Sequence, residues 1–63
     1  MKKLFNGVYT YKGVTVERLG GTGMYISYVY VKDLKLPIKI CGATQASFKR
    51  IFNEKVVEYG GLK

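Results

Sequence analysis

The chain has 63 residues, 48% of them hydrophobic, and its 11 Lys and Arg outnumber its 4 Asp and Glu to give a net charge of +7. This length has room for one domain, residues 1–63, with a thin core, and a single cysteine excludes an internal disulfide. Because the chain has no histidine and few carboxylates, we expect no metal, no cofactor and no enzymatic activity.

A two-stranded hairpin is predicted near the start of the chain. Residues 8–11 and 14–19 are rich in β-branched and aromatic side chains, and only Lys12 and Gly13 separate them. Gly13 can adopt the positive φ that a two-residue turn requires. The hairpin then places four apolar side chains on one face, which we expect to be the core face: Tyr9, Tyr11, Val14 and Val16.

The glycine-rich loop at residues 20–23 leads into a third strand, residues 24–31, with large apolar side chains on both faces. With Leu19 opposite Met24, the core set is Tyr25, Ser27, Val29 and Val31, and the outer set is Met24, Ile26, Tyr28 and Tyr30. A shift of one residue exchanges the two sets, and the sequence leaves both registers open. In either register one aromatic set faces away from the core, so a homodimer that covers the second sheet face is one alternative.

A short fourth strand and a helix complete the chain. Residues 36–41 form the strand, with Pro37 at its start, and Thr44 is a good N-cap for a helix over residues 45–59. The helix has an apolar stripe at spacings of three and four: Phe48, Ile51, Phe52, Val56 and Tyr59. We therefore predict an α+β fold, an antiparallel sheet of three to four strands with one C-terminal helix packed on one face.

The apolar runs of this chain also bear on its location. None approaches the roughly 20 residues of a membrane-spanning helix. The positive start, Met1-Lys2-Lys3, is soon followed by Asn and Gly rather than by the apolar stretch of a signal peptide. We therefore expect a cytoplasmic protein without membrane contacts.

Basic and aromatic residues lie on neighbouring predicted strands, which is typical of sheets that stack bases and contact phosphates. The charge of +7 favours polyanionic partners. We therefore predict a small, basic, non-enzymatic protein that binds DNA or RNA. The phosphate contacts are assigned to Lys12, Arg18, Lys32 and Lys39, and the stacking to Tyr28 and Tyr30.

The alternative is a protein-binding inhibitor or adaptor, of the kind that phages and mobile elements often encode. An apolar sheet face with tyrosines and surrounding lysines has the composition of a protein interface, and the positive charge selects an acidic partner. The contact surface in this hypothesis is Met24, Ile26, Tyr28 and Tyr30. A third interpretation is that the lysines only keep the sheet soluble and its edges unpaired.

Overall fold

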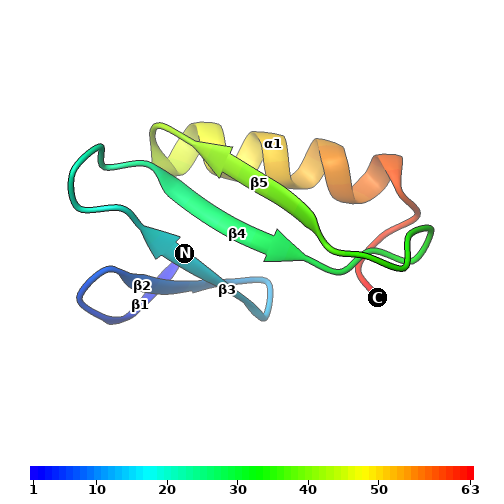
Figure 1. Ribbon diagram of the computed structural model, residues 1–63, viewed down its shortest axis with the longest axis horizontal. Coiled ribbons are helices and arrows are strands. Elements are labelled where there is room, and N and C mark those ends of the chain that lie inside the picture. The colour runs from blue at the N-terminus through cyan, green and yellow to red at the C-terminus, as the bar shows by residue number, and fades with distance from the viewer.

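The computed structural model describes all 63 residues as a five-stranded antiparallel sheet with one helix on one of its faces (Figure 1). The strands lie in their order along the chain: β1 (Lys2–Phe5), β2 (Val8–Tyr11), β3 (Val14–Arg18), β4 (Tyr25–Val29) and β5 (Ile38–Gly42). The helix α1 (Gln45–Glu58) follows β5 and packs mainly against β5 and β4. The predicted α+β class is therefore confirmed.

The sheet has one strand more than the upper count that the sequence predicted. The additional strand, β1, pairs with β2 across a turn at Asn6 and Gly7, and its register shifts between Lys3 and Phe5. Asn-Gly between apolar residues is a strong hairpin signal. All residues of β1 are exposed, however, so the strand lacks the alternation of buried and exposed side chains by which strands are recognised.

The predicted hairpin of β2 and β3 is confirmed. Lys12 and Gly13 have φ angles of 51° and 80°, and a type I′ turn requires positive φ at both central positions. Tyr11 pairs with Val14 across this turn. All of the side chains predicted for the core face pack in or against the core: Tyr9, Tyr11, Val14 and Val16.

The register between β3 and β4 is the one that places Leu19 opposite Met24. The Leu19 N–H donates to the Met24 carbonyl at 2.8 Å, and Arg18 pairs with Tyr25. The predicted core set is buried: Tyr25, Ser27, Val29 and Val31. In the outer set, Tyr28 is 62% and Tyr30 57% exposed, so both tyrosines point away from the core.

The last strand and the helix close the core. β5 begins at Ile38, after Pro37, and not at residue 36 as predicted. Thr44 is the N-cap of α1, and its side-chain oxygen accepts a hydrogen bond from the Ser47 N–H at 3.1 Å. The buried residues of α1 are Phe48, Phe52 and Val56. No helix in the structure is long and apolar enough to cross a membrane.

Candidate functional site

The face of the sheet opposite α1 has no second layer over it, and we call it the open face (Figure 1). Its side chains alternate with the core positions along each strand. They include Phe5, Val8, Glu17, Leu19, Ile26, Tyr28, Tyr30, Lys39 and Cys41.

One row of the open face crosses all five strands. Phe5 pairs with Val8, and Val8 pairs with Glu17. Glu17 pairs with Ile26, which pairs in turn with Cys41. Directly paired residues share a face of the sheet, so these side chains form a continuous line. The line is apolar except at its centre, where the carboxylate of Glu17 lies.

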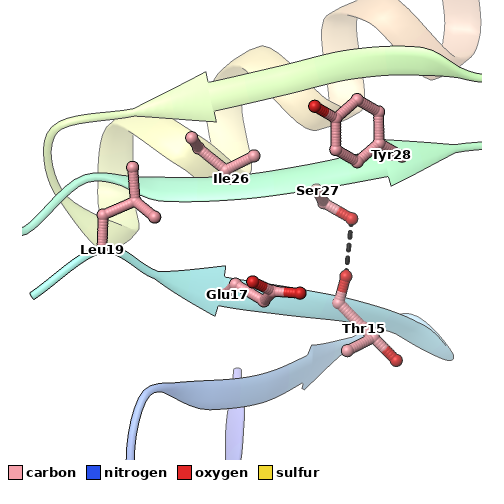
Figure 2. Close-up of a pocket in the computed structure, with 6 residues that line it drawn as sticks. All are labelled: Thr15, Glu17, Leu19, Ile26, Ser27 and Tyr28. Carbon is pink, nitrogen blue, oxygen red and sulfur yellow. Dashed lines mark hydrogen bonds between the residues drawn. The ribbon is translucent and has the colours of Figure 1, made fainter.

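A hollow of about 370 Å³ lies on the open face where β3 and β4 diverge (Figure 2). The ladder between these strands consists of two pairs, Glu17 with Ile26 and Arg18 with Tyr25. Beyond Glu17 the ladder stops, and the Ser27 hydroxyl instead donates to the Thr15 carbonyl at 2.7 Å. The lining residues are Thr15, Glu17, Leu19, Ile26, Ser27 and Tyr28. The hollow thus combines apolar walls with one carboxylate.

Glu17 has no cationic partner within the protein. Two ion pairs are present, Arg50 with Glu54 and Lys55 with Glu58, both at 3.5 Å and both within α1. The residues paired with Glu17 on either side are apolar. A free carboxylate is notable here, because the chain carries 11 Lys and Arg side chains.

The predicted nucleic-acid contacts lie in separate places, and the open face brings three of them together. Tyr28 and Lys39 pair directly across β4 and β5. Tyr30 follows on the same side, between the buried Val29 and Val31. A tyrosine ring and an ammonium group are therefore neighbours on this face. The protein contacts predicted for the alternative, Met24, Ile26, Tyr28 and Tyr30, belong to this side as well.

The other predicted contacts lie outside the paired strand positions of the open face. Lys12 reaches to the helix, where its Nζ donates to Asn53 Oδ1 at 2.7 Å. Arg18 pairs with the core residue Tyr25, so it belongs to the helix side of the sheet. Lys32 lies in the loop after β4, and its N–H donates to the Gly61 carbonyl at 3.0 Å.

Sequence reasoning missed two features of the surface. The first is Glu17, whose isolation depends on its neighbours across two other strands. The second is a group of cations around Tyr11, whose ring centroid lies 5.5 Å from Lys12 Nζ and 5.8 Å from Lys49 Nζ. A hydrogen bond from Lys49 lowers the pKa of the Met1 amino group below its usual value of 8.0, and desolvation and charge repulsion act in the same direction.

Comparisons with known proteins do not place the chain in a family. No family model matches the chain, and neither a curated protein nor a solved structure matches it. No group of three or more His, Cys, Asp or Glu residues is positioned to hold a metal ion together. The shape, charge and exposure of the open face are therefore the features that bear on function.

Proposed function

We propose that this chain is a small binding protein that covers an acidic protein partner with the open face of its sheet. The observation that carries the proposal is the row of paired residues across all five strands, apolar at Phe5, Val8, Ile26 and Cys41. Interface centres are apolar and rich in aromatic side chains, and Tyr28 lies beside this row, 62% exposed. Apolar side chains grouped in this way on an uncovered sheet face are typical of an interaction site.

The charge of the chain favours an acidic partner over a second copy of itself. Of its 11 Lys and Arg side chains, only Arg50 and Lys55 form ion pairs with carboxylates. Two molecules of net charge +7 repel each other as they approach, whereas an acidic surface is attracted and its association is accelerated. Lys39, on the outermost strand of the open face, is placed to meet an acidic group at the edge of the interface.

Site-specific photo-crosslinking tests this proposal in the cells that make the protein. A benzoylphenylalanine at Thr10, which pairs with Thr15 on the open face, is expected to capture one discrete acidic protein. The same group at Val57, 77% exposed on α1, is the matched control and should not capture that protein. Equal capture from both positions, or a covalent dimer of the chain itself, would contradict the proposal.

Affinity measurements with the purified partner then test the contact residues. Truncation of an aromatic side chain near the centre of an interface costs about tenfold or more in Kd. We therefore expect Tyr28→Ala to weaken binding by at least about that factor, with Val57→Ala unchanged. The thermal midpoint of the Tyr28→Ala variant should stay nearly the same, because the side chain is exposed. Unchanged affinity would remove Tyr28 from the interface.

A second candidate function is the binding of DNA or RNA, which the direct pairing of Tyr28 with Lys39 favours. A base can stack on the tyrosine ring while the ammonium group contacts the adjacent phosphate. Tyr30 offers a second ring for stacking. A nucleic-acid strand would have to bend around the sheet to contact Lys12, Arg18 and Lys32 as well. Glu17 opposes this function, because it presents a negative charge at the centre of the same face.

Titration with short single- and double-stranded DNA and RNA across a salt series tests the second candidate. If Lys39 contacts a phosphate, Lys39→Ala should lower the log–log salt slope by about one. Lys55→Ala is the matched control, because Lys55 is already paired with Glu58 on α1. If DNA and RNA binding disappears at physiological salt in every variant, the second candidate is wrong and protein binding remains the proposed function of this face.

A further inference from the structure

We infer that the hollow beside Glu17 receives an arginine side chain of the protein partner. This inference rests on the proposed function, since it names the group that the partner inserts into the open face. The hollow has a volume of about 370 Å³, and Leu19, Ile26 and Tyr28 form apolar walls next to the carboxylate of Glu17 (Figure 2). An aliphatic chain that ends in a cation fits such a combination of walls and charge.

Charge complementarity indicates that the group bound in the hollow is a cation. Glu17 is a carboxylate of the open face without an ion pair, in a chain that carries 11 Lys and Arg side chains. Its paired neighbours, Val8 and Ile26, offer neither a hydrogen bond nor a charge from their side chains. When a partner covers this face, the carboxylate loses water and needs a cation, because a buried unpaired charge is strongly unfavourable.

Arginine suits the hollow better than lysine does. A guanidinium group can donate two parallel hydrogen bonds to the carboxylate of Glu17 and stack on an aromatic ring at the same time. Tyr28 supplies that ring, because it lines the same hollow and is 62% exposed. The bond of 2.7 Å between the Ser27 hydroxyl and the Thr15 carbonyl spans the gap between β4 and β3 beside Glu17, so two of the lining residues are held together (Figure 2).

The arrangement gives the interface a defined orientation. Lysines such as Lys39 attract acidic groups of the partner toward the edge of the open face, and Glu17 accepts a cation only at its centre. A phosphate or an acidic side chain placed at the hollow would be repelled. A partner must therefore present an arginine surrounded by acidic residues, and proteins with a uniformly acidic surface are rejected.

The probe for this inference is n-butylguanidinium, titrated into the isotope-labelled full chain while amide chemical shifts are recorded. We expect saturable shifts at the hollow, at Leu19, Ile26 and Tyr28, with a weak affinity appropriate to so small a ligand. Glu17→Gln should weaken the probe by about fivefold, the upper range for an exposed ion pair. Glu54→Gln is the control, because Glu54 lies on α1 and should leave the affinity unchanged.

Three results would overturn the inference. The first is saturable binding of n-butylguanidinium with equal affinity for the wild type and Glu17→Gln. The second is binding of the neutral alcohol 1-pentanol with the same affinity as n-butylguanidinium. The third is chemical-shift changes that do not saturate or that lie outside the hollow. The proposed function is tested separately by crosslinking from Thr10. If the partner is captured but n-butylguanidinium does not bind, the inference of an arginine in the hollow is wrong and the proposed function of the open face is retained. If the probe binds and no partner is captured, the proposed function fails instead.

Discussion

The hydroxyl of Ser27 donates a hydrogen bond of 2.7 Å to the main-chain carbonyl of Thr15, across the point where the β3–β4 ladder has ended. Ser27 is 3% exposed whereas Thr15 lies at the surface, so the bond is part-buried. In this position a side chain takes over a role that main-chain pairing has in the rest of the sheet.

Removal of this hydroxyl should destabilise the protein. Ser27→Ala leaves the Thr15 carbonyl without its donor, and the loss of such a part-buried bond costs about 1–2 kcal/mol in the free energy of unfolding. Urea denaturation measures the change. Thr15→Ala is the control, since it keeps the carbonyl and removes only an exposed side chain, and it should stay within about 0.5 kcal/mol. Equal stability of the wild type and Ser27→Ala would show that water replaces the hydroxyl.

A methyl group at Gly42 should also destabilise the protein. A Cβ built on Gly42 would lie 2.6 Å from the backbone nitrogen of Phe48, where the last strand meets the first turn of the helix. Because backbone atoms cannot move aside, we expect Gly42→Ala to cost about 1–3 kcal/mol by thermal or urea denaturation. Gly20→Ala is the control, as nothing lies within 4 Å of its Cβ. If both variants unfold alike, α1 does not approach β5 as closely as described.

The two tyrosines of β4 should behave in opposite ways. Tyr25 is 8% exposed and packs edge-on against Tyr9 with the ring centroids 5.6 Å apart, so Tyr25→Ala should cost about 3 kcal/mol or more. Tyr28→Ala removes a side chain that is 62% exposed and should change stability by less than about 0.5 kcal/mol. Circular dichroism melts of the two variants decide this. If Tyr28→Ala is the more destabilising variant, the assignment of Tyr25 to the core face and of Tyr28 to the open face is wrong.

The N-terminus of α1 offers a test of the cap. Thr44→Ala removes the acceptor of the Ser47 N–H and should lower the free energy of unfolding by about 1 kcal/mol. Thr44→Ser keeps a hydroxyl at the same position and should restore most of that loss. If Thr44→Ser is as destabilising as Thr44→Ala, the contribution comes from the packing of the methyl group and not from the hydrogen bond.

The features that could be predicted from the sequence are those with local signals. Lys12 and Gly13 separate two β-rich segments by the length of a two-residue turn, and Thr44 precedes an amphipathic stripe. These local features fix the hairpin register and the start of the helix. The register between β3 and β4 remained open because the glycine loop between Leu19 and Met24 carries no side-chain signal that selects one alignment.

The candidate site could be predicted only in part, because it depends on contacts between strands and helix. The exposure of Tyr28 follows from alternation once the register is known. The isolation of Glu17 requires knowledge of which residues lie beside it on β2 and β4. The sequence assigns Lys12 a phosphate contact, but its Nζ donates to Asn53 on α1, a contact that no local pattern encodes.

The two-pair ladder between β3 and β4 also bears on how the chain folds. Each strand pairs with its neighbour in sequence, so every hairpin closes a short loop, and such local contacts favour rapid folding. β4 and β5 share the longest ladder of the sheet, and with α1 they contain most of the buried residues, so these three elements can form a first folding unit. The three N-terminal strands join this unit through the two-pair ladder and through core side chains, among them Tyr11 against Phe52 with ring centroids 5.0 Å apart and Tyr9 against Tyr25 at 5.6 Å. The hollow thus lies beside the shortest ladder of the sheet, and we expect any local opening of the sheet to begin there and to change the shape of the hollow first.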